Sequence, residues 1–146
     1  SPTPTATPQI SNMSGDYTGT VTDSGGGTRN SGTVNSGLLA QQGSNAGGVI
    51  VSTQSGGPLN LAMSLNVSSS NAVTGSMVAD YADQTTCTYS VTGTYTNTGT
   101  PPATLNGSYT AVTGCTGVTG TFALTQQCTD TVTPSDRRVM NVPAAC

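Results

Sequence analysis

Hydrophobic and polar residues alternate along much of this chain, and the alternation is clearest over residues 59–67. Leucine, methionine and valine occupy every second position there, with asparagine, alanine or serine between them. Successive side chains of a β-strand point to opposite faces of a sheet, so this segment has one apolar and one largely polar face. The pattern predicts a strand with one face in a core and the other in water.

A five-residue motif recurs four times in the second half of the sequence. Its five positions hold an aliphatic residue, a polar residue, a glycine, a residue with a hydroxyl group and a large residue. The four copies begin at Val73, Val91, Leu105 and Val118. On a strand, the aliphatic residue, the glycine and the large residue share one face. A glycine between two bulky neighbours lets a strand bend and leaves room for a ring from the adjacent strand. The repeated inward glycines therefore predict a curled or closed sheet.

Turn-forming residues divide the chain from residue 14 onward into eight candidate strands. Connections of roughly 4 to 8 residues suit neighbouring antiparallel strands. We therefore expect an all-β fold, an antiparallel up-and-down meander of about eight strands that closes into a small barrel and so removes exposed edges. A β-sandwich is the alternative. The expected strands are residues 15–22, 32–41, 47–53, 59–67, 72–81, 86–95, 104–112 and 118–126.

The large residues on the apolar face of these strands are expected to point into the barrel. The sequence leaves open whether they fill the interior or leave part of it hollow for a ligand. The expected interior residues are Tyr17, Leu61, Met63, Met77, Tyr89, Tyr95, Tyr109 and Phe122.

Composition narrows the classes of function. The chain of 146 residues has room for one domain, its net charge is -3, and it contains no lysine, glutamate, histidine or tryptophan. Its three cations, Arg29, Arg137 and Arg138, form no basic stripe, so nucleic acid and anionic membrane surfaces are poor partners. Because the usual proton carriers and nucleophiles are missing, we expect no catalysis and no cofactor. Asp136 next to Arg137 is interpreted as a local surface ion pair.

Four cysteines, an even number in a small loop-rich chain, predict two disulfides in an oxidising compartment. Zinc ligation is disfavoured because they are 28, 13 and 18 positions apart and histidine is absent. Of three possible pairings we favour Cys87 with Cys115, which a hairpin of the sixth and seventh expected strands would bring together at its open end. Cys128 with Cys146 would then pin the C-terminal tail to the last strand. Each bridge would contribute roughly 2 to 4 kcal/mol.

The two ends of the chain differ in sequence character from its centre. The sequence divides into a Pro/Thr-rich extended tail at residues 1–13, a barrel domain at 14–128 and a C-terminal tail at 129–146. No apolar run is long enough for a signal peptide or a membrane span, so we expect a secreted or surface-displayed protein without direct membrane insertion, its leader already removed. Residues 9–13 could pair with a neighbouring subunit. The residues assigned to an assembly tail are Pro2, Pro4, Pro8, Ile10 and Met13.

Acidic residues offer one possible cation site. Asp80 and Asp83 lie three positions apart after a predicted strand, and with Asn71 or Asp16 they could supply oxygen ligands for Ca²⁺. Capping of an exposed turn is the interpretation that we favour for these two aspartates. No other metal site is indicated.

The number of strands, the opening Gly15-Asp-Tyr-Thr-Gly19 and the repeated glycine-aromatic strands resemble the calycins, the eight-stranded meander barrels that include lipocalins and avidins. The resemblance covers about residues 14–126. It implies a barrel whose mouth can hold a small ligand. Lipocalins and avidins usually carry tryptophan near the start of the first strand, where this chain has Tyr17. The complete lack of tryptophan argues against biotin as that ligand.

Two classes of function remain. The first is a secreted structural protein that assembles with copies of itself into an extracellular filament or pilus-like fibre through its N-terminal tail. The nearly charge-free, hydroxyl-rich composition and the lack of a catalytic set favour this class. The alternative is a calycin-like surface module that holds a small apolar molecule in a hollow barrel.

Overall fold

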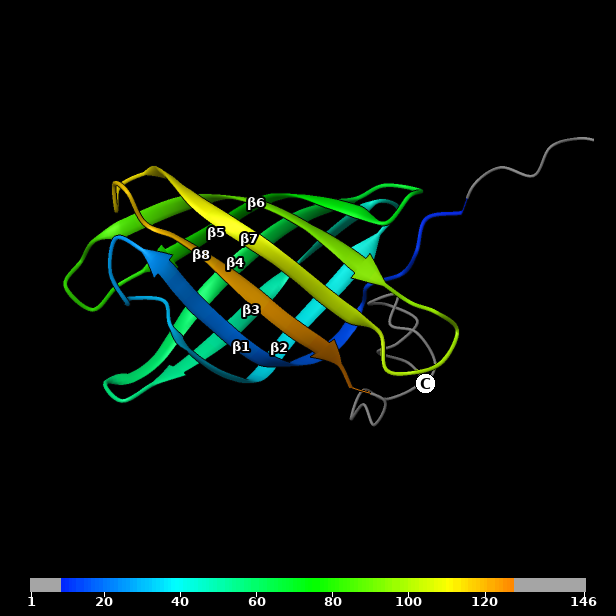
Figure 1. Cartoon of the computed structure of the whole chain (residues 1–146), viewed down its shortest axis with the longest axis horizontal. Coiled ribbons are helices and arrows are strands. Elements are labelled where there is room, and N and C mark those ends of the chain that lie inside the picture. The colour runs from blue at the N-terminus through cyan, green and yellow to red at the C-terminus, as the bar shows by residue number, and fades with distance from the viewer. Residues whose placement is uncertain (1–8, 128–146) are drawn as a thin grey trace, which may run out of the picture.

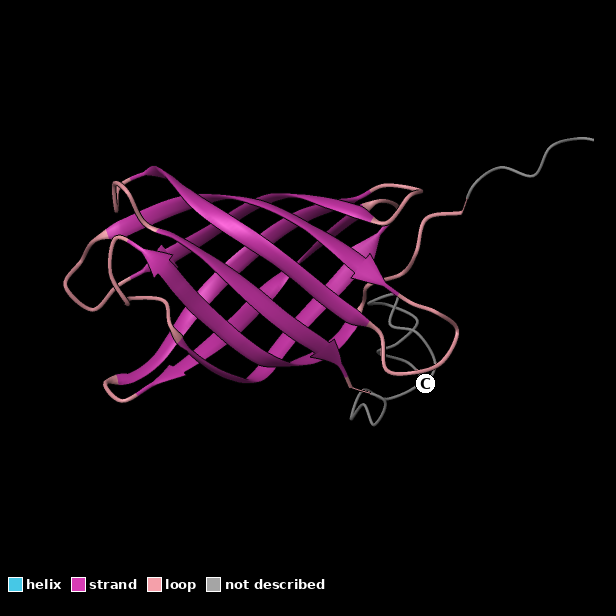
Figure 2. Cartoon of the chain, viewed as in Figure 1, coloured by secondary structure: helices cyan, strands magenta, loops and turns pink. Residues whose placement is uncertain are grey.

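The computed structural model describes residues 9–127, which form an antiparallel barrel (Figure 1). Each strand pairs with its neighbours in sequence, and pairing of the first strand with the last closes the barrel. The described residues contain strands and loops (Figure 2), and no helix among them is long and apolar enough to cross a membrane. The strands are β1 (Gly15–Gly25), β2 (Gly32–Gln42), β3 (Asn45–Gln54), β4 (Gly57–Val67), β5 (Ala72–Asp80), β6 (Thr86–Thr96), β7 (Thr104–Thr113) and β8 (Thr119–Gln126).

The predicted all-β meander and its closure are confirmed, and the sandwich alternative is wrong. Several strand ends differ from expectation by one to three residues. β1 runs on to Gly25 because that residue still pairs with Thr119 of β8 after a bulge. β5 stops at Asp80 because the backbone of Tyr81 turns to accept a hydrogen bond from the Gln84 amide.

All eight expected interior residues are buried in one continuous core. Prediction from alternation missed others on β2 and β3, where apolar residues follow one another without a break. Leu39 and Ile50 are completely buried, while their neighbours Leu38 and Val49 point outward. A run of consecutive apolar residues does not reveal which of them faces the interior.

Two of the motif glycines make room for rings, as the sequence suggested. Gly107 pairs with Phe122 and Gly120 pairs with Tyr109 across the β7–β8 ladder. A Cβ atom on either glycine would overlap the ring of its partner. The space left at Gly120 lets the Tyr109 ring lie edge-on to Tyr89, with the ring centroids 5.4 Å apart.

The segment before β1 folds back onto its own barrel. Met13, expected in a tail that contacts a neighbour, is completely buried in the core of its own chain. The Ser11 hydroxyl donates to Asn71 Oδ1 at 2.6 Å, and the Met13 amide donates to Gln41 Oε1 at 2.8 Å. These contacts mean that residues from Ser11 onward belong to the barrel, earlier than the sequence suggested. Ile10 is 39% exposed, and Pro2, Pro4 and Pro8 lie outside the described residues.

The expected disulfide between Cys87 and Cys115 is present. It joins the start of β6 to the loop after β7, the open end of the predicted hairpin. The second expected pair, Cys128 and Cys146, lies outside the described residues, as does the Asp136-Arg137-Arg138 stretch. The confirmed bridge links the β6–β7 hairpin at the end opposite to its turn.

Candidate functional site

Four connections gather at one end of the barrel, which we call the mouth: β1–β2, β3–β4, β5–β6 and β7–β8 (left in Figure 1). Polar side chains from the end of β1 and from the β1–β2 loop meet three tyrosines there. We name this group the mouth network. It consists of Asp23, Asn30, Tyr81, Tyr89 and Tyr109.

Asp23, at the end of β1, is the charged centre of the mouth network. Its carboxylate accepts hydrogen bonds from the Asn30 amide at 2.8 Å, from Asn30 Nδ2 at 3.0 Å and from the Tyr109 hydroxyl at 2.5 Å. The two bonds from Asn30 fold the β1–β2 loop back over the barrel. Three donors stabilise this half-buried carboxylate.

Asn30 connects Asp23 to the other tyrosines and is itself completely buried. The Tyr81 hydroxyl donates to Asn30 Oδ1 at 2.6 Å, and Asn30 Nδ2 also lies 3.0 Å from the Tyr89 hydroxyl. The two tyrosine hydroxyls are 2.7 Å apart. Since Tyr81 gives its proton to Asn30, Tyr89 must be the donor in the bond between them. Every member of the mouth network thus has a hydrogen-bond partner.

Arg29 closes the mouth from outside. Its guanidinium carbon lies 3.9 Å from the centroid of the Tyr81 ring, and its Nη2 donates to Asp83 Oδ2 at 2.8 Å. The pair ties the β1–β2 loop to the β5–β6 loop. Hydrogen bonds from Thr85 are the main reason that the pKa of Asp83 lies below its usual range, and Arg29 lowers this pKa further. Because both partners are well exposed, the ion pair itself adds little stability.

Burial strengthens the hold of two mouth-network tyrosines on their protons. It is the main cause that raises the pKa values of Tyr81 and Tyr109, and the bonds to Tyr89 and Asp23 respectively raise them further. Both hydroxyls therefore keep their protons at neutral pH. In this arrangement the mouth network can hold a loop in place and exclude water. The described residues of this group contain no activated nucleophile beside a base.

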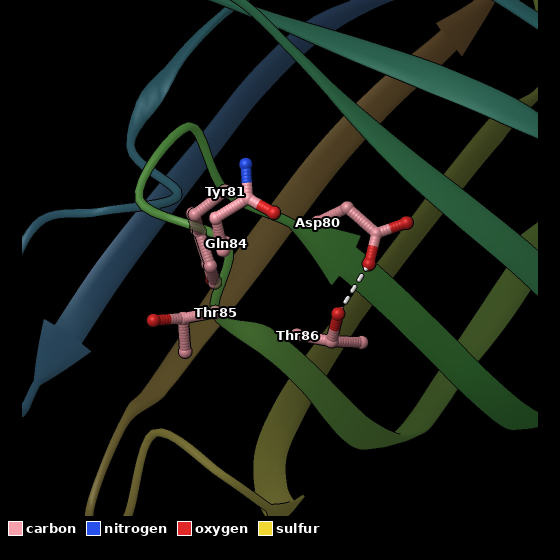
Figure 3. Close-up of a pocket in the computed structure, with 5 residues that line it drawn as sticks. All are labelled: Asp80, Tyr81, Gln84, Thr85 and Thr86. Atoms are coloured by element: carbon pink, nitrogen blue, oxygen red, sulfur yellow. Dashed lines mark hydrogen bonds between the residues drawn. The ribbon is translucent and has the colours of Figure 1, made fainter.

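Two shallow hollows border the mouth network at Tyr81, which lines both. One, of about 380 Å³, is bordered by Arg29, Gln54, Leu59 and Asp83 among others. The other, of about 290 Å³, is lined by Asp80, Tyr81, Gln84, Thr85 and Thr86, and Figure 3 shows the Thr86 hydroxyl donating to the Asp80 carboxylate at 2.6 Å. Both hollows open to solvent, and the smaller one exposes mostly polar side chains, so it suits water or a small polar molecule.

The Ca²⁺ site considered from sequence does not come together. Asp80 and Asp83 border the same hollow, but Asn71 lies in the β4–β5 connection and Asp16 near the start of β1, both at the far end of the barrel. Asp80 accepts from Thr86, and Asp83 is paired with Arg29. Over residues 9–127 no group of three or more possible metal ligands is found.

The far end of the barrel, which we call the base, is closed by a second polar network. The Gln41 Nε2 group donates to the Ser11 carbonyl at 2.7 Å, and Gln126 Nε2 donates to the Ser14 carbonyl at 2.7 Å. The Tyr17 hydroxyl donates to the Met13 carbonyl at 2.6 Å. Sequence reasoning missed both glutamines, although Gln41 and Gln126 continue the inward phase of Leu39 and Leu124 and are buried. Their position two residues after Leu39 and Leu124 was the sequence signal by which both glutamines could have been predicted.

The geometry thus gives a barrel that its own residues fill and close at both ends. No protein-family model, curated protein or solved structure matches this chain.

Proposed function

We propose that this protein is a non-enzymatic structural domain of the cell exterior that assembles with copies of itself. One observation carries this proposal: the barrel is occupied by its own side chains and closed at both ends by its own polar networks. Tyr17, Tyr89, Tyr95 and Tyr109 are almost completely buried within it. Such a solid barrel suits a rigid building block.

The same observation disfavours the alternative of an apolar ligand in the lumen. A barrel that binds a ligand needs a free interior and an open mouth. Here the mouth network closes one end, and Met13 with Gln41 closes the other. Among the described residues, no buried polar side-chain atom lacks a hydrogen-bond partner that a ligand might supply. A bound molecule would have to displace large side chains together with their hydrogen bonds.

An extracellular location and a calycin-like ancestry belong to the same proposal. The eight-stranded meander barrel is the architecture of calycins. The Cys87–Cys115 disulfide suits an oxidising compartment. With 19 glycines and 6% charged residues, the composition suits an extracellular structural subunit more than a catalyst.

Closure of the barrel limits how copies can associate. Every strand within residues 9–127 is paired on both sides, so this part of the chain has no free strand edge to accept a strand from a neighbour. Residues 11–13 are bound to their own barrel and cannot serve as that strand. Assembly must therefore use side-chain surfaces, with residues 1–8 as a further contact.

Light scattering and electron microscopy of the purified protein test this proposal. The full chain is expected to form polymers that grow with protein concentration, and a chain that starts at Gln9 is expected to polymerise less. The cut is placed before Gln9 because Ser11 and Met13 help to close the base. Circular dichroism of both chains serves as the control for folding. A monomer at every concentration that co-purifies with an apolar molecule would instead support the ligand-binding alternative.

A further inference from the structure

The larger of the two hollows at the mouth is bordered by the β1–β2 loop, the β3–β4 turn and the β5–β6 loop. Its lining combines apolar and polar side chains, and its volume of about 380 Å³ falls at the lower end of the range for small-molecule sites. The apolar members are Pro58, Leu59, Tyr81 and Ala82, and the polar members are Arg29, Gln54, Asp80 and Asp83.

The protein itself holds several of these side chains in place. Gln54 Nε2 donates to the Arg29 carbonyl, and Arg29 Nη2 donates to Asp83 Oδ2 at 2.8 Å. The Arg29 guanidinium lies over the Tyr81 ring, whose hydroxyl donates to the completely buried Asn30. Groups that are ordered before a ligand arrives lose little conformational freedom when it binds. The lining is therefore preorganised for binding.

Three of the polar members keep atoms that have no hydrogen-bond partner among residues 9–127. Arg29 uses Nη2 and leaves Nε and Nη1 as donors. Gln54 uses Nε2 and leaves Oε1 as an acceptor. Asp80 accepts from Thr86 through Oδ1 and leaves Oδ2 as a second acceptor. The hollow is thus bordered by unused donors and unused acceptors next to apolar side chains.

The charges around the hollow favour a neutral ligand. Arg29 and Asp83 already neutralise each other, so a carboxylate or phosphate bound to Arg29 would lie close to the Asp83 carboxylate and be repelled. Asp80 is exposed, and a single exposed carboxylate holds a cation only weakly. Charged side chains nevertheless make stronger hydrogen bonds to neutral groups than uncharged ones do.

We propose that this hollow binds a neutral saccharide, either as a free sugar or as the end of a glycan chain. A sugar hydroxyl both donates and accepts, so it can use the guanidinium and the acceptor oxygens together. The C–H groups of a sugar ring are apolar and match Pro58 and Leu59. The smaller hollow shares Asp80 and Tyr81 with the larger one and gives room for a second ring or for water (Figure 3).

Saccharide binding goes beyond the proposed self-assembly and does not depend on it. The barrel interior stays closed, because the hollow lies outside the mouth network and borders it at Tyr81. A structural domain of the cell exterior would gain a contact to glycans by this route. Because the hollow is shallow and open to solvent, we expect a dissociation constant of about 1 mM.

Saturation-transfer NMR that observes the sugar tests the proposal with the full chain, and it works for monomers and polymers alike. The probes are glucose, galactose, mannose and N-acetylglucosamine, each titrated through the expected dissociation constant. Glycine, which carries both an ammonium and a carboxylate group, is titrated in the same way as a charged comparison. At least one of the sugars is expected to bind saturably, and glycine is expected not to bind.

Two variants locate the binding site. Asp80→Asn removes the charged acceptor and keeps the shape of the side chain, and we expect the dissociation constant to rise about 10-fold. Arg29→Met removes the donors and keeps an unbranched side chain over the Tyr81 ring, so it should also weaken binding. Asp16→Asn, the same change at the base of the barrel, is the matched control and should bind like the wild type. Circular dichroism checks the folding of each variant.

The outcomes decide the proposal. Sugar binding that weakens in Asp80→Asn and Arg29→Met, and not in Asp16→Asn, supports the hollow as the site. The proposal is wrong if none of the four sugars binds, or if binding is the same in all three variants. Binding of glycine without binding of sugars would also overturn it. Polymer formation, which light scattering measures without sugar, is unaffected by any of these results.

Discussion

At the scale of single residues, tyrosines carry out two tasks in this barrel. Their rings fill a core that is poor in large aliphatic side chains, and their hydroxyls reach polar partners at the barrel ends. Tyr89 and Tyr109 belong to the mouth network, while Tyr17 and Tyr95 bond to the closing segment at the base. Burial of the rings was predictable from alternation. The hydrogen-bond partners of the hydroxyls were not predictable, because the β1–β2 loop brings Asn30 close to Asp23 and the tyrosines.

Tyr109→Phe removes a hydroxyl that donates to a carboxylate and leaves the ring in place. We expect a loss of about 1.5 to 3 kcal/mol in the free energy of unfolding, because hydrogen bonds to charged groups are the stronger kind. Tyr95→Phe is the matched comparison, since the Tyr95 hydroxyl bonds to the neutral Gln126 Oε1 at 3.1 Å. It should cost only about 0.5 to 1.5 kcal/mol. Urea titration measures both, and equal losses would contradict the role given to Asp23.

At the scale of elements, the segment before β1 acts as a plug. Met13 inserts into the base while Ser11 and the Met13 backbone are held by Asn71 and Gln41. Sequence alone placed this segment in a tail, because serine and asparagine surround the methionine and no alternation marks it. Burial of Met13 depends on a barrel end that exists only after β1 and β8 have paired.

Met13→Ala should lower the free energy of unfolding by about 2 to 5 kcal/mol, since it leaves a cavity in a packed core. Ile10→Ala, three residues earlier in the same segment, serves as the control. Ile10 is 39% exposed, so its loss should change stability by no more than about 0.5 kcal/mol. Thermal or urea unfolding of the two variants gives the comparison. Equal stability of the Met13→Ala and Ile10→Ala proteins would contradict the conclusion that burial of Met13 stabilises the base of the barrel.

At the scale of the whole molecule, closure joins distant parts of the chain. β1 pairs with β8, so residues separated by about the length of the domain meet in one ladder. Tyr17 and Tyr95 are buried towards the base and Tyr109 towards the mouth, where Tyr81 is partly buried, and burial is the main cause that raises the pKa of each. The stability of the whole fold is therefore expected to depend on pH in the alkaline range.

The protein should lose stability as the pH rises above about 10. The unfolded tyrosines have a pKa of 10.0, while four of them in the folded state have higher values. Below pH 10 these groups are protonated in both states, and the full stability is present. Above it only the unfolded chain releases these protons, which favours unfolding. Phenolate absorbance should rise together with loss of β-structure in circular dichroism. Early ionisation with the fold intact would contradict this.

Sequence by itself determined the strands, their order and most of the core. Two-residue alternation and turn residues are local signals, and short connections leave a meander as the simplest pairing. The Cys87–Cys115 bridge followed from the expected hairpin and is confirmed. These features depend on residues near one another along the chain.

Only the tertiary structure decided what meets at the ends and on the outside of the barrel. The mouth network joins residues from β1, the β1–β2 loop, the β5–β6 loop, β6 and β7, and strand register decides which apolar residues of β3 and β4 face outward. A shift of one residue in register would reverse which apolar residues face outward. A run of consecutive apolar residues does not alternate, so the sequence does not indicate which of them faces inward. Closure and packing of the barrel determine the face that each one occupies.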